Sequence, residues 1–302
     1  MLKISKIVVA AWAATLVLTS PVCAAAPPML GKIAAHPALW TVHGPKGTAY
    51  LFGSIHILPP NMTWHTPQVD AAMDASDVFV FEIPMDDSTK TETENFVRDN
   101  GFLPPSVALP SLLDNEARKD YAATLALTHV PPAALVNKRP WLASLVLEVG
   151  YMGSRGLSAE SGVDRNVYAE ALAHGGKTFR AFETPEQQFR LLMPANQKLE
   201  IDEFDVSLKE ILHDRGEIGE LIDAWASGDV AKLAALTKED VKGHPEVEKA
   251  FFEDRNRNWV GQIGKMLGEK HIYFITVGAG HLAGPKGVPA LLRTAGYKVD
   301  GP

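Results

Sequence analysis

Short apolar segments rich in β-branched and aromatic residues alternate along this chain with longer segments of helical spacing. Glycines and prolines separate the two kinds of segment, as turns and helix ends require. Strands that alternate with helices are typical of an α/β sheet. We therefore expect an α/β fold with a central mixed β-sheet, helices on its faces and a largely helical insertion or cap. The predicted strands are residues 40–43, 50–58, 78–83, 177–183, 271–277 and 297–299.

The segments between these strands carry signals for helices and turns. Residues 44–47 contain the glycines and proline of a hairpin turn between the first two strands. Residues 85–160 are mostly of helical type, with breaks at prolines, and we expect them to form the insertion. Thr184, Pro185 and Gln187 predict the N-cap, first-turn proline and capping-box glutamine of another helix.

The N-terminus has the pattern of a secretory signal peptide over residues 1–26. Lys3 and Lys6 precede an apolar run at residues 7–18, and small residues follow up to Ala26. The run is shorter than the ~20 residues of a membrane-spanning helix, so an uncleaved anchor is the less favoured alternative. We expect a bacterial protein that is periplasmic or secreted, with no stable membrane span after cleavage. A flexible tether at residues 27–39 and one domain over residues 40–302 are predicted to follow.

Composition excludes several classes of function. Cys23, the only cysteine, lies in the predicted signal peptide, so the mature chain is expected to lack disulfides, thiol nucleophiles and cysteine-ligated metals. Acidic residues outnumber basic ones by 36 to 29, and the net charge of −7 opposes binding to a phosphate backbone. Nucleic acid is therefore not an expected partner. A dinucleotide site is also disfavoured, because Ala283 stands where the loop after Gly278 and Gly280 would need its last glycine.

Polar side chains stand at or near the ends of four predicted strands. His56 lies near the end of the strand 50–58, Glu82 and Glu183 lie at the ends of two others, and His281 follows the strand 271–277. Each histidine is the fourth residue of a G-x-x-H sequence. Because ligands in α/β sheets bind outside the carboxyl ends of the strands, we expect these side chains to converge on one crevice.

Two imidazoles with one or two carboxylates suit a divalent ion that keeps one position open for water. A spare carboxylate can then act as general base, so hydrolysis is the simplest chemistry for this set. Purely structural roles for the same four side chains are the alternative to this interpretation. Either histidine can bond to the backbone, Glu82 can pair with Arg180 or Arg255, and Glu183 can be a helix N-terminal acid.

The same segments, taken in order along the chain, resemble the TraB/GumN (TraB/PrgY/GumN) family, whose animal relatives include the Tiki metalloproteases. The resemblance extends from about Trp40 to the C-terminus and covers nearly the whole mature chain. Ser54 is one departure, because many relatives carry threonine there. The resemblance rests on Tyr50-Leu51-Phe52-Gly53-Ser54-Ile55-His56, Glu82, Gly162-Val163-Asp164, Phe182-Glu183-Thr184-Pro185-Glu186-Gln187, Arg255-Asn256 with Trp259, and Val277-Gly278-Ala279-Gly280-His281-Leu282.

This resemblance implies a metal-dependent, peptidase-like hydrolase, with Mn or Co favoured and Zn as an alternative. It makes His56, Glu82 and His281 candidate metal ligands, and it makes Glu82, Glu183 and Arg255 candidate catalytic residues. The arginine would stabilise an oxyanion or orient Glu82. The expected substrate is a peptide or another small acyl compound.

Other interpretations stay open at this stage. A protein with the same constellation can bind a peptide or saccharide without turnover, or serve as a non-catalytic accessory protein of polysaccharide export. His65, in the proline-rich loop after His56, is a candidate to line the pocket. Asp164 is expected either to cap its helix or to pair with Arg165.

Overall fold

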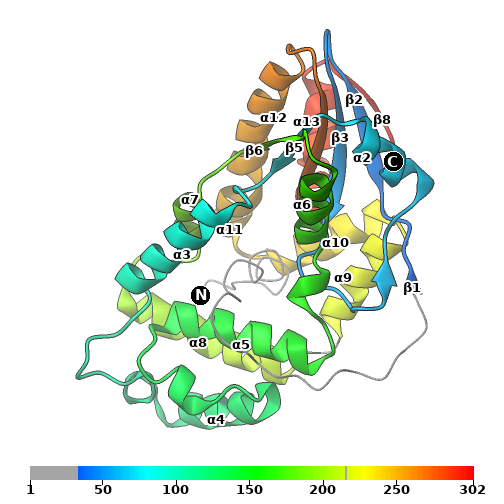
Figure 1. The fold of residues 1–302 in the computed structure, drawn as a ribbon. Helices are drawn as coiled ribbons and strands as arrows, with labels where there is room; N and C mark the ends of the chain where they lie inside the picture. Colours follow the sequence, from blue (N-terminus) through cyan, green and yellow to red (C-terminus); the bar gives the residue numbers. More distant parts are fainter. Residues whose placement is uncertain (1–32, 215) are drawn as a thin grey trace.

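A mixed six-stranded sheet with the strand order β6-β5-β7-β3-β2-β8 forms the centre of the fold. The computed structural model describes residues 33–214 and 216–302, so the predicted signal peptide and residues 27–32 of the predicted tether lie outside the described residues. The α/β fold predicted from the sequence is confirmed (Figure 1). The strands of the sheet are β2 (Leu39–His43), β3 (Thr48–Ser54), β5 (Val78–Phe81), β6 (Thr178–Ala181), β7 (Ile272–Gly278) and β8 (Lys298–Asp300).

Four neighbouring strands, β6, β5, β7 and β3, run parallel, whereas β2 is antiparallel to both β3 and β8. Three strands are shorter than the sequence pattern predicts, and they end at Ser54, Phe81 and Ala181. His56, Glu82 and Glu183 therefore stand just beyond their strands. Because parallel strands end at the same edge of a sheet, the three residues lie at one edge.

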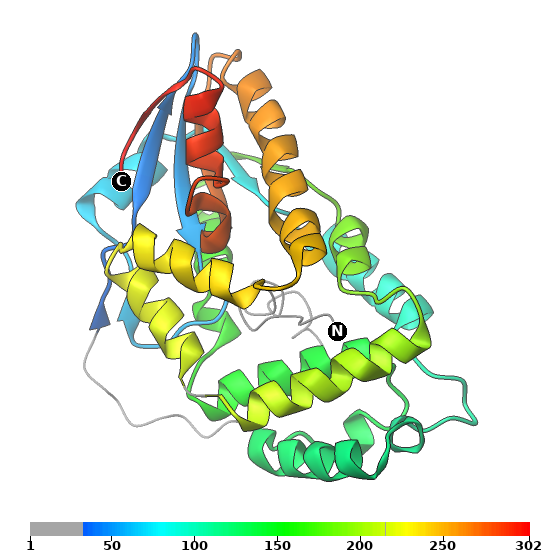
Figure 2. The ribbon, with the colours of Figure 1, turned by 180° about the vertical axis from the view of Figure 1, so that it is seen from behind.

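Alternate side chains of the strands enter two apolar cores, one on each face of the sheet. Phe52 and Phe274 belong to the core that includes side chains of α2 and α6, and Figure 1 views this face with α6 in front. Leu51 and Ile275 belong to the core that includes side chains of α12 and α13, which stand in front in Figure 2. These helices are α2 (Pro67–Ala75), α6 (Val163–His174), α12 (Asp254–Met266) and α13 (Val288–Thr294).

The helical cap is built from two stretches of the chain. Residues 85–160 form helices and short 3₁₀ turns and give no strand to the sheet, as predicted. The helices α4 and α5 of this stretch pack with α8, which comes later in the sequence, and the three form the lower layer in Figure 1. The helix α3 packs against α7. Their bounds are α3 (Asp87–Asn100), α4 (Asn115–Thr128), α5 (Pro140–Ser154), α7 (Pro185–Leu191) and α8 (Gln197–Leu212).

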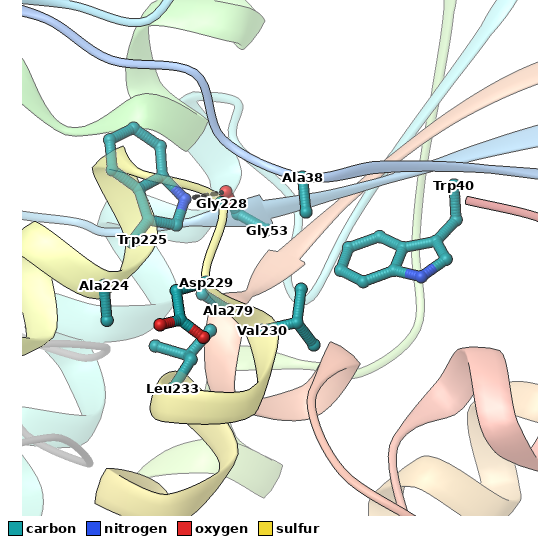
Figure 3. A pocket seen from close by; sticks show the side chains of 10 residues that line it. All are labelled: Ala38, Trp40, Gly53, Ala224, Trp225, Gly228, Asp229, Val230, Leu233 and Ala279. Atoms are coloured by element: carbon teal, nitrogen blue, oxygen red, sulfur yellow. Dashed lines mark hydrogen bonds between the residues drawn. The ribbon is translucent and has the colours of Figure 1, made fainter. Parts of the chain in front are cut away.

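Two further helices, α9 (Glu217–Ala226) and α10 (Val230–Asp240), pack beside the end of β3. The indole Nε1 of Trp225 on α9 donates to the carbonyl oxygen of Gly53 at 2.8 Å, and Figure 3 shows the ring directed at this strand. A cavity of about 10 Å³ lies beside this contact. It has room for about one water molecule, so it is a packing gap of the core and too small for a substrate.

The first described residues contact the domain. The strand β1 (Ile33–Ala34) pairs in parallel with β4 (Met62–Thr63), and Ala35 is buried. The described end of the predicted tether is therefore packed against the domain, and the boundary at residue 40 stays a prediction. Across residues 33–214 and 216–302, no helix combines the length and the hydropathy that crossing a membrane requires.

Candidate functional site

His56 and Asp164 form a buried hydrogen-bonded pair at the carboxyl edge of the sheet. His56 lies in the loop after β3, and Asp164 lies in the first turn of α6. The Nδ1 of His56 is 2.7 Å from the Oδ1 of Asp164, and the two residues are only 8% and 7% exposed. A Cβ atom at Gly162 would collide with the carbonyl oxygen of His56. A glycine at this position therefore lets α6 approach closely enough to bring Asp164 to the imidazole.

The other ring nitrogen of His56 makes no such bond. Its Nε2 is buried and has no hydrogen-bond partner among the described residues. Because the carboxylate of Asp164 only accepts hydrogen bonds, Nδ1 of the neutral imidazole carries the proton and Nε2 carries the lone pair. Burial alone would lower the pKa of His56, but the adjacent Asp164 carboxylate, with Glu82 adding to it, raises that pKa above its usual value. His56 therefore presents a nitrogen that is more basic than an ordinary imidazole.

Glu82 follows β5 directly, and its carboxylate accepts hydrogen bonds from three groups. Oε2 accepts from Nη2 of Arg255 at 2.6 Å and from Nε2 of Gln188 at 2.9 Å, while Oε1 accepts from the N–H of Gly278 at 2.7 Å. Burial alone would raise the pKa of Glu82, but Arg255 and then His281 lower it to about 2. Glu82 is therefore held in its ionised form and is a weak base at neutral pH.

Glu183 stands on the other side of the same guanidinium. Its Oε1 accepts from Nε of Arg255 at 2.9 Å and from the indole Nε1 of Trp259 at 2.8 Å. Its Oε2 accepts from Nη2 of Arg255 at 3.0 Å and from Nε2 of Gln188 at 3.1 Å. Arg255 and Gln188 thus bridge the two carboxylates that follow β5 and β6.

His281 lies in the 3₁₀ helix η7 (Ala279–Leu282), which follows β7. Its Nδ1 is 2.6 Å from Oδ1 of Asn256, whose Nδ2 donates to the carbonyl of Lys286 at 2.9 Å and so fixes the amide. Its Nε2 is 3.0 Å from Nη1 of Arg255, and since a guanidinium only donates, Nε2 is the acceptor. Burial and then the nearby Arg255 lower the pKa of His281 to about 3. His281 is therefore neutral, with both ring nitrogens engaged.

A pocket of about 370 Å³ lies against this cluster. Thr276 on β7 lines it, and the Oγ1 of this residue is a second buried atom with no hydrogen-bond partner among the described residues. The predicted residues Glu183, Arg255 and His281 do not line the pocket. Its polar lining includes His56, Glu82, Asp164, Gln188, Asp86 and Lys90, and its apolar lining includes Phe81, Ile83, Met85, Tyr168 and Leu172.

The three predicted metal ligands belong to one cluster, but the ligand atoms of Glu82 and His281 already bond to other groups. Nε2 of His281 lies 4.0 Å from Oε1 of Glu82, and Arg255 donates to both residues. Within residues 33–214 and 216–302, no group of three histidine, cysteine or acidic side chains has a geometry that would hold a metal ion. As arranged, the residues do not fit a divalent ion, and the assignment of His56, Glu82 and His281 as ligands stays a prediction.

The sequence did not predict the places of several other residues of the site. Asp164 and Asn256 lie in segments that carry the family resemblance, so the sequence did mark them. It did not predict that Asp164 bonds to His56 or that Asn256 bonds to His281. Gln188 follows the predicted capping box directly, and Thr276 lies inside a strand, so nothing in their local sequence distinguishes them.

The fold and the cluster define the class of this protein. It is an α/β protein with a buried histidine–aspartate pair and an arginine-centred cluster at the carboxyl edge of its parallel strands, beside a pocket. Residues 38–301 match the TraB/PrgY/gumN family, and the chain belongs to this family, as the sequence predicts. The chain is also 19% identical, over 272 residues, to an uncharacterized protein of Treponema pallidum (strain Nichols); the match covers 84% of this chain and 79% of that protein. No solved structure matches the chain.

Proposed function

We propose that this protein is a hydrolase of peptide or other acyl bonds in which His56 removes a proton from the attacking water. The supporting observation is the buried Nε2 of His56, which has no partner in the described part of the chain and belongs to a residue that lines the pocket. Asp164 holds the other ring nitrogen at 2.7 Å. A base oriented by a carboxylate, beside a space for substrate, is the arrangement that general-base catalysis requires.

In the proposed reaction, the lone pair of Nε2 accepts one proton of a water molecule while the water oxygen attacks the carbonyl carbon of the substrate. The electron pair of the carbonyl π bond moves to its oxygen, which becomes an oxyanion. When the carbonyl re-forms, the bond to the leaving nitrogen or oxygen breaks, and Nε2 returns the proton to that atom. Asp164 stabilises the intervening imidazolium, because its carboxylate accepts the hydrogen bond from Nδ1.

Glu82 and Thr276 have separate roles in this proposal. Glu82 stays ionised and stabilises the imidazolium through its negative charge, since its low pKa makes it a poor proton acceptor. The Thr276 hydroxyl lines the same pocket without a partner of its own among the described residues, and we assign it as a donor to the oxyanion. Arg255 and Glu183 do not line the pocket and act as positioning residues that hold Glu82 in place.

The proposals for an ion, a substrate and a cellular location rest on the sequence and on the family resemblance. The resemblance implies Mn or Co, with Zn as an alternative, but the reaction above has no step through an ion, because the predicted ligands do not fit one as arranged. The proposed substrate is a peptide or a small acyl compound. The predicted signal peptide favours a periplasmic or secreted enzyme, and neither nucleic acid nor a membrane is a proposed partner.

The proposal is tested by turnover of a fluorogenic peptide library and of p-nitrophenyl acyl esters by the purified protein. We expect His56→Ala to abolish turnover and His65→Ala to retain it. His65 is the matched control, because it is exposed, lies 2.6 Å from Asp70 and does not line the pocket. Full turnover by a folded His56→Ala variant would refute the assigned base. Binding of a peptide or saccharide without any turnover by the wild type would favour the non-catalytic binding or accessory role instead.

A further inference from the structure

The guanidinium of Arg255 lies between Glu82, Glu183 and His281. Nη2 donates to Oε2 of Glu82 at 2.6 Å and to Oε2 of Glu183 at 3.0 Å, and Nη1 donates to Nε2 of His281 at 3.0 Å. Nε donates to Oε1 of Glu183 at 2.9 Å. Two of the three predicted ion ligands, Glu82 and His281, are therefore already bonded to one positive charge, and so is the neighbouring Glu183.

An ion and this guanidinium need the same electron pairs. A divalent ion binds carboxylate oxygens and imidazole nitrogens at about 2.0–2.2 Å through their lone pairs. Oε2 of Glu82, both carboxylate oxygens of Glu183 and Nε2 of His281 here direct lone pairs at Arg255. Arginine keeps its positive charge in proteins, so it cannot become neutral to tolerate a neighbouring ion. Two cations in one buried cluster would also repel each other strongly, because the local dielectric constant is low.

Arg255 is held in this position by more than its ion pairs. Its side chain is 8% exposed, and Nη1 also donates to the carbonyl oxygen of Phe251 at 3.1 Å. The guanidinium carbon lies 4.7 Å from the centre of the Trp259 ring, a cation–π distance. Displacing Arg255 would break these contacts and would leave two carboxylates without their shared cation.

We infer that Arg255 is the resident cation of this cluster and that it blocks a divalent ion from binding through His281, Glu82 and Glu183. The inference does not depend on the proposed hydrolysis, because ion binding is measured without any substrate. It predicts that removing the guanidinium creates an ion site that the wild type lacks.

The test is a titration of chelator-stripped protein with MnCl₂ and with CoCl₂, followed by calorimetry and by the visible absorption of Co²⁺. We expect the wild type to bind no ion through His281. We expect Arg255→Leu to bind one ion per chain, at least about tenfold tighter than the wild type, and to lose it again when His281→Ala is added. Arg180→Leu is the matched control, since Arg180 also bonds a glutamate, Glu269 at 3.0 Å, but lies outside the cluster.

Two outcomes would overturn the inference. One is that the wild type binds one ion per chain and that His281→Ala abolishes this binding. This measurement uses only proteins that retain Arg255. The other is a folded Arg255→Leu variant, by circular dichroism, that binds an ion no tighter than the wild type. If Arg255→Leu does not fold alone, refolding it with and without CoCl₂ replaces the titration. Recovery of the fold only with the ion supports the inference, and no recovery with the ion counts against it.

Discussion

The imidazole Nδ1 of His56 lies 2.7 Å from the carboxylate of Asp164, although 108 positions separate the two residues in the sequence. One residue follows the third strand and the other begins α6, and both line the same pocket. This contact favours the tautomer of neutral His56 with the proton on Nδ1, and it leaves Nε2 for the proton transfer that we propose. The chemistry of the site therefore depends on how α6 is placed against the sheet.

Asp164→Asn tests this contact directly. The amide removes the negative charge that stabilises the imidazolium and permits the opposite tautomer of His56. We expect kcat/KM to fall about 10²–10⁴-fold, with a smaller effect on KM than on kcat. Steady-state kinetics with the best peptide or ester substrate measure this. A variant as active as the wild type would show that Asp164 has only a structural role.

Thr276→Val separates catalysis from stability. The Oγ1 of Thr276 is buried and bonds to no other described residue, so replacing it with a methyl group of similar size should leave the melting temperature unchanged or raise it slightly. We expect kcat to fall about tenfold or more, since one oxyanion donor is typically worth about 10²-fold or more. Unchanged turnover would reject Thr276 as a donor. Ser54→Ala is the control. It also removes a buried hydroxyl that bonds to no described residue, but Ser54 does not line the pocket.

Arg139→Ala tests the junction between α5 and α8 in the cap. Nη2 of Arg139 donates to Oε2 of Glu200 at 2.8 Å, and Glu200 is 1% exposed. Removing the guanidinium leaves a buried carboxylate without its cation, which should reduce the free energy of unfolding by about 2–4 kcal/mol. Urea denaturation measures the loss. Arg98→Ala, at an exposed pair with Asp99, is the control and should change stability by less than about 1 kcal/mol.

Glu203→Gln should stabilise the protein in alkaline but not in acidic solution. Burial, followed by the nearby Glu200 carboxylate, raises the pKa of Glu203 from 4.5 to about 7. The folded state therefore binds this proton more tightly than the unfolded state, and its contribution to stability is lost as pH rises from about 4.5 to 7. Above that range the folded state carries a disfavoured charge.

The neutral amide that Glu203→Gln introduces removes that charge. We expect a gain on the order of 2 kcal/mol at pH 8 and little change at pH 4.5, measured by urea denaturation at both values. Glu94→Gln, on the exposed face of α3, is the control and should shift neither curve. Equal effects of Glu203→Gln at both pH values would contradict the assigned pKa shift.

Local sequence signals predicted the elements that carry the site. The capping box at Thr184 and Gln187 is present in the structure and starts α7 directly after Glu183. The ends of the strands were placed less well, because His56 and Glu82 follow their strands and are not part of them. Strand length depends on the pairing partner, and the residues of one strand do not contain that information.

The sequence did not determine the ion-pair partner of Glu82 either, for the same reason. The sequence left Arg180 and Arg255 as equal partners for Glu82, and only the structure shows that Arg255 bonds to it while Arg180 bonds to Glu269. The cap likewise includes α8 as well as residues 85–160, because α8 folds back onto α4 and α5.

The sequence by itself determined the family, the α/β class and the residue types that gather at the carboxyl edge of the sheet, because periodicity, caps and short motifs are local properties of the chain. Only the tertiary structure decided that Asp164 orients His56 and that Arg255 stands between Glu82, Glu183 and His281. These contacts join residues far apart in the chain, and their energies depend on burial and on distances that exist only after the strands and helices have packed.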